Sequence, residues 1–86
     1  MPYHKDKQQA FQAAQQGVDQ AIDVYNDLVK NDPDYGRHLK ELKNEINEAF
    51  QQIDNALEVA SENQLDQLRK FKNDLESIVS RVDFDE

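Results

Sequence analysis

The sequence contains no cysteine, which excludes a disulfide framework, a thiolate nucleophile and a cysteine-based zinc site. Glycine and proline occur only twice each, so turn signals are few and long helices are favoured. No stretch approaches 18 apolar residues, and the N-terminus has no apolar region typical of a signal peptide. We therefore expect a cytoplasmic protein without a membrane-spanning segment.

Positive charge is also scarce, because 10 Lys and Arg residues stand against 18 Asp and Glu residues. The net charge of -8 repels phosphate backbones and anionic headgroups, so it disfavours binding to nucleic acid and to membrane surfaces. A chain of 86 residues predicts one domain, residues 1–86, with a thin core and frayed termini.

Apolar residues recur in steps of three and four along three segments, which is the spacing of a single helix face. Alternation with a period of two is absent, so strands are not expected. The three predicted core stripes are Phe11, Ala14, Val18, Ala21, Tyr25 and Leu28; Tyr35, Leu39, Leu42, Ile46, Ala49, Ile53, Ala56 and Ala60; and Leu68, Phe71, Leu75, Ile78 and Val82.

The pattern predicts helices over residues 5–30, 33–60 and 63–82 in an all-α, antiparallel, up-down-up three-helix bundle. The break between the last two helices is inferred from a change in the phase of the apolar spacing near "ASENQ". There Ser61 and Gln64 have capping-box spacing, and Asn63 is a candidate cap or left-handed residue. The rival interpretation is one helix through residues 34–82, which would give a long helical hairpin that dimerises.

The stretch "KNDPDYGRH" is the chemically richest part of the chain, and it raises the question of a calcium loop. Glycine and glutamate do not fall at the positions that an EF-hand requires. Helix-boundary signals explain the stretch better. We expect Lys30 to end the first helix and Asn31 to take the left-handed conformation that follows a helix. For the second helix, we expect Asp32 to be the cap, Pro33 to be the first helical residue and Asp34 to lie at the positive pole.

Residues that carry catalytic chemistry are sparse. The two histidines, His4 and His38, lie at opposite ends of the predicted hairpin, so they cannot share a metal ion. The only hydroxyl-bearing Ser and Thr residues are three serines, and no glycine-rich loop could hold an oxyanion or a phosphate. We therefore expect no enzyme, no metal and no cofactor. One alternative remains, a histidine phosphotransfer module in which His38, followed by Leu-Lys-Glu, accepts the phosphoryl group.

Apolar residues beside the stripes suggest where a partner could bind. Val24, Val29, Val59 and Val79 flank the stripes, and a thin bundle need not cover them all. We expect a non-catalytic role in regulation or as an accessory factor, through an unidentified protein partner or a homodimer. Gly17 interrupts the first helix next to Val18, which indicates either close approach of another helix or a binding notch or hinge.

The whole chain, including "DPDYGRHLKELKNEINEAF", resembles the small uncharacterised helical proteins of Bacillus-type Gram-positive bacteria, the YtzC-like kind among them. That resemblance implies a helical fold and no activity. The chain is also similar in size to secreted WXG-type helical hairpins. Those proteins carry Trp-x-Gly in the turn between the helices, where this chain has Tyr35 and Gly36 and no tryptophan.

Overall fold

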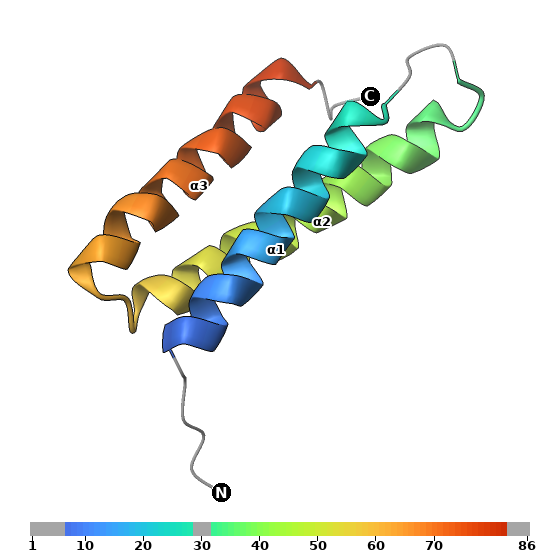
Figure 1. Cartoon of the computed structure of the whole chain (residues 1–86). Helices are drawn as coiled ribbons and strands as arrows, with labels where there is room; N and C mark the ends of the chain where they lie inside the picture. The colour runs from blue at the N-terminus through green and yellow to red at the C-terminus, as the bar shows by residue number, and fades with distance from the viewer. Residues whose placement is uncertain (1–6, 29–31, 83–86) are drawn as a thin grey trace, which may run out of the picture.

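The computed structural model describes residues 7–28 and 32–82. These residues form three helices and no strand: α1 (Lys7–Asn26), α2 (Tyr35–Leu57) and α3 (Glu62–Arg81). Successive helices run in opposite directions, so the chain goes up, down and up (Figure 1). The predicted all-α three-helix bundle is confirmed. The predicted roles of Lys30 and Asn31 fall outside the described residues.

The core is built from the predicted stripes. Every buried apolar residue in the described part of the chain belongs to one of them: Ala14, Val18, Ala21, Leu39, Leu42, Ile46, Ala49, Ile53, Ala56, Leu68, Leu75 and Ile78. The buried set holds no polar or charged residue among those described. The helices are therefore held together mainly by burial of apolar surface, at roughly 25 cal/mol per Å².

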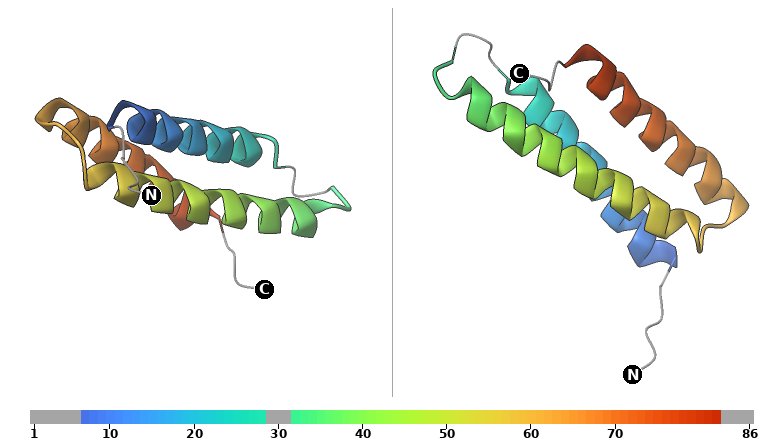
Figure 2. Two further views of the ribbon diagram at one scale, coloured as in Figure 1. Left: turned by 90° about the horizontal axis from the view of Figure 1, so that it is seen from below. Right: turned by 180° about the vertical axis from the view of Figure 1, so that it is seen from behind.

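Helices α1 and α2 form the most extensive contact, and α3 packs less extensively against both of them (Figure 2). At the middle of the α1–α2 contact, a Cβ atom placed on Gly17 would lie 3.3 Å from Cα of Ala49. Gly17 therefore allows close approach of the two helix backbones, which is the first of the two interpretations of this glycine. Between α1 and α3, Phe11 contacts Phe71, with ring centroids 5.7 Å apart.

Helix α2 begins two residues after the predicted start at residue 33, and its N-cap residue is Asp34. Asp32 lies in the turn before the helix. Its Oδ1 accepts a hydrogen bond from Asp34 N–H at 2.8 Å, and its carbonyl oxygen accepts one from Tyr35 N–H at 2.9 Å. The prediction that Asp32 caps the helix is therefore wrong, because Pro33, which favours the second position of a turn, places a turn before the first helical residue.

Helices α2 and α3 are separate, so the rival prediction of one helix through residues 34–82 is wrong. The chain leaves α2 after Leu57, and α3 begins at Glu62 with Ser61 as its N-cap. Gln64 N–H donates to Ser61 Oγ at 3.4 Å, and Ser61 N–H donates to Gln64 Oε1 at 3.2 Å. This capping box confirms the spacing prediction. Asn63 is the second residue of α3 and has no positive φ, so the prediction that it is a cap or a left-handed residue is wrong.

Candidate protein-binding groove

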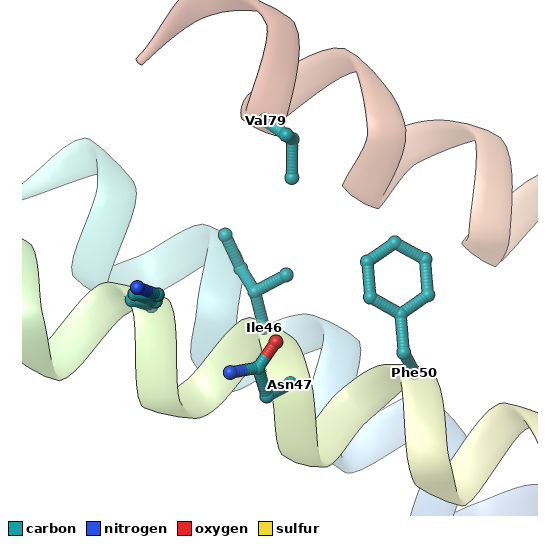
Figure 3. A pocket seen from close by; sticks show the side chains of 5 residues that line it. Ile46, Asn47, Phe50 and Val79 are labelled. Atoms are coloured by element: carbon teal, nitrogen blue, oxygen red, sulfur yellow. The ribbon is translucent and has the colours of Figure 1, made fainter. Parts of the chain in front are cut away.

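An open groove of about 250 Å³ lies between α2 and α3 (Figure 3). We call it the α2–α3 groove and define it by its lining residues: Lys43, Ile46, Asn47, Phe50 and Val79. Val79 projects from α3 toward Ile46 and Phe50 of α2 (Figure 3). The lining is therefore an apolar surface of three side chains, with one amide and one ammonium group beside it.

The sequence places these side chains at the edge of the core. Ile46 belongs to the buried stripe of α2, and Phe50, four residues later, lies on the same side of that helix and is half-buried. On α3 the stripe uses Ile78, and Val79 is rotated from it by about 100° around the helix axis. Val79 therefore faces the space beside α2 instead of the centre of the bundle.

Val79 is 42% exposed, which makes it the only large apolar side chain classed as exposed in the described part of the chain. A single exposed apolar residue is ordinary on a protein surface. Here, however, the exposed side chain borders a groove that two further apolar side chains line. The combination forms a small concave apolar surface that a second molecule could fill.

The other valines selected from the sequence do not join this surface. Val24 is half-buried and packs against the core, and Val59 lies in the connection between α2 and α3. Val59 precedes the start of α3, whereas Val79 lies near its end, about 26 Å along the helix axis from Glu62 at 1.5 Å per residue. Val29 lies outside the described residues. The four valines thus do not form one continuous patch.

Sequence reasoning did not select four of the five groove residues as site residues. Ile46 is predicted as a core residue, and Lys43 and Asn47 carry no signal of a site. The usable signal was the antiparallel pairing of α2 with α3, which brings the first half of α2 alongside the last half of α3. To predict which residues of the two helices lie opposite each other, the length of the connection at residues 58–61 must be known. The shift in the apolar pattern near "ASENQ" gives that length only approximately.

His38 lies in the first turns of α2, where its backbone N–H donates to the carbonyl oxygen of Asp34 at 3.0 Å. Its side chain is half-exposed, and it is not among the residues that line the α2–α3 groove. The residues described hold no group of three His, Cys, Asp or Glu side chains arranged to bind a metal ion. Nor does any described helix have the length and apolar character needed to cross a membrane.

The chain matches no protein-family model, no curated protein and no solved structure to which it was compared. The resemblance to YtzC-like helical proteins therefore stays a prediction. Any functional assignment must come from the geometry of the α2–α3 groove and from the charges around it.

Proposed function

We propose that this protein is a non-catalytic binding module that holds another protein through the α2–α3 groove. The observation that carries the proposal is Val79, the only exposed large apolar side chain in the described part of the chain, which borders the half-buried Phe50 and the buried Ile46 in the groove. Burial of such a surface by a partner is favourable because it removes apolar area from water.

The dimensions of the groove favour a partner side chain over a small-molecule ligand. Pockets for small molecules usually enclose about 300–1,000 Å³ and bury most of their ligand. The groove holds about 250 Å³ and is open to solvent. It matches one or two apolar side chains presented by a partner, which is the arrangement found where an amphipathic segment lies in a hydrophobic groove.

The homodimer alternative is less favoured by charge. Two copies that each carry a net charge of -8 repel one another, and the repulsion is strongest at low ionic strength. We therefore expect the purified chain to be a monomer in light scattering. A dimer that the substitution Val79→Asp dissociates would show that a second copy fills the groove, and it would overturn the assignment to a different protein.

The direct test compares two variants that each add one negative charge to α3. Val79→Asp places a carboxylate in the groove, whereas Ser77→Asp places one on an exposed position about 200° away around the helix. Tagged wild-type protein and both variants are used to capture partners, and the captured proteins are quantified. We expect a partner held by wild type and by Ser77→Asp to be lost with Val79→Asp, while circular dichroism shows that all three chains are folded.

Two results would contradict the proposal. One is equal capture of every protein by the two variants, which would mean that the groove is not the contact surface. The other is a wild-type chain that captures nothing beyond what an unrelated acidic helical bundle captures.

A further inference from the structure

Among the described residues, Lys43 is the only charged one that lines the α2–α3 groove, although the chain as a whole carries a net charge of -8. Lys40 lies one turn before Lys43 on α2, and the exposed side chains of both are therefore on the same side of the helix. This end of the groove is locally positive on an acidic molecule. The charge at this end of the groove is therefore opposite in sign to the net charge of the chain. It favours partners that present a negative group there.

The acidic residues near the groove lie elsewhere along it. Glu76 is one turn before Val79 on α3, and Asp54 is one turn after Phe50 on α2. Neither lines the groove. Along α2 the charge therefore changes from positive at Lys40 and Lys43 to negative at Asp54, with the apolar lining between them. On α3, Lys72 lies two turns before Val79 on the same side of the helix, so the positive end at Lys43 is a local feature of α2.

We propose that the α2–α3 groove binds a peptide segment of a partner protein in which an apolar side chain is followed or preceded by a carboxylate, with that carboxylate directed to Lys43. This inference rests on the proposed function and specifies the chemistry of its partner. The apolar side chain fills the space between Ile46, Phe50 and Val79. The carboxylate pairs with the Lys43 ammonium group at the edge of the groove, at the end nearer the start of α2.

The charge arrangement explains how an acidic protein could recognise an acidic segment. Beyond a Debye length of about 8 Å at physiological ionic strength, the net negative charge is largely screened, so the nearest charges decide the contact. The long stem of Lys43 can cover apolar surface while its head group stays in water. Exposed pairs of this kind contribute more to the choice and orientation of a partner than to affinity.

The test uses two synthetic peptides with the same leucine and phenylalanine anchors. One carries two aspartates beside the anchors, and the other carries two lysines at the same positions. Each peptide is titrated into ¹⁵N-labelled full-length chain, and the backbone amide shifts are followed by NMR. We expect the acidic peptide to shift the amides of Ile46, Asn47 and Val79, and to bind more weakly as NaCl is added.

Two charge reversals of equal size separate the groove from the rest of the surface. Lys43→Glu changes the charge in the groove, whereas Lys70→Glu changes the charge at an exposed position of α3. Lys70 is nine residues, or two and a half turns, from Val79, so it lies on the opposite side of the helix. We expect Lys43→Glu to weaken binding of the acidic peptide about two- to fivefold, because a single exposed pair contributes little affinity. Lys70→Glu should change it less than about twofold, because it alters only the screened net charge.

The outcomes separate this inference from the proposed function. If the basic peptide shifts the groove amides and the acidic one does not, the assignment of an acidic partner is overturned while the groove remains a docking surface. Equal weakening by Lys43→Glu and Lys70→Glu also overturns the assignment, because net charge would then explain it. If neither peptide shifts groove amides, the inference fails, and the Val79→Asp capture experiment still decides the proposed function on its own.

Discussion

The two glycines of this chain have opposite structural roles. Gly17 lies in the α1–α2 contact, where an added Cβ would be 3.3 Å from Cα and 3.4 Å from Cβ of Ala49. Gly36 lies in the first turn of α2, and an added Cβ would meet no atom within 4 Å. Neither glycine has a positive φ. Only Gly17 is therefore required by packing, whereas Gly36 carries the entropic cost of glycine without that benefit.

This difference predicts opposite effects of substitution. Gly17→Leu should lower the free energy of unfolding by about 1–3 kcal/mol, because the added side chain forces α1 away from the Ala49 backbone. Gly36→Ala should raise it by about 0.5 kcal/mol, because alanine restricts the unfolded chain and is the better helix former. Urea unfolding followed by circular dichroism at 222 nm measures both. A Gly17→Leu variant as stable as wild type would show that the two helices are not held at this distance.

At the scale of the helix, the ends of α2 and α3 are defined in different ways. The N-cap of α2, Asp34, makes no capping hydrogen bond through its side chain, and the turn before it is held by Asp32. The exposed ion pair between Arg37 and Asp34, 3.2 Å long, adds little stability because water and salt screen it. The start of α3 instead depends on the reciprocal hydrogen bonds of Ser61 and Gln64.

We therefore predict that α3 is sensitive to its cap. Ser61→Ala removes the acceptor for Gln64 N–H and should lower the free energy of unfolding by about 1 kcal/mol. Ser61→Asp keeps an acceptor at the N-cap and adds a charge that suits the positive end of the helix, so it should stay within about 0.5 kcal/mol of wild type. Equilibrium unfolding in urea compares the two variants. Equal destabilisation by both would show that the hydrogen bond to the N-cap does not support α3.

The helices and their buried faces could be predicted from the sequence because both depend on local spacing. Ile46, Leu68 and Leu75 lie on stripes with steps of three and four residues, and the structure buries all three. The groove could not be predicted in the same way. It exists because α3 leaves Val79 uncovered beside Phe50, and the packing of two helices against each other is a tertiary property that no local pattern contains.

At the scale of the whole molecule, the net charge of -8 acts across the entire bundle. The molecule has extents of 46 × 29 × 19 Å. At about 10 mM ionic strength the Debye length is about 30 Å, which is close to the width of the bundle, so most of the excess negative charges repel one another. At about 150 mM it falls to about 8 Å, and only neighbouring charges interact. Salt should therefore relieve repulsion that exists in the folded state.

We predict that the melting temperature rises when NaCl is increased from about 10 mM to about 150 mM. Relief of repulsion on the order of 1 kcal/mol corresponds to about 4–8 °C for a domain of this size. The paired change Asp19→Asn and Asp23→Asn removes two exposed charges from α1 and should raise the melting temperature at low salt while reducing the response to NaCl. Thermal unfolding followed by circular dichroism measures each value. If the melting temperature of wild type instead falls as NaCl is added, attraction between neighbouring charges outweighs the repulsion across the bundle, and the net charge does not limit stability.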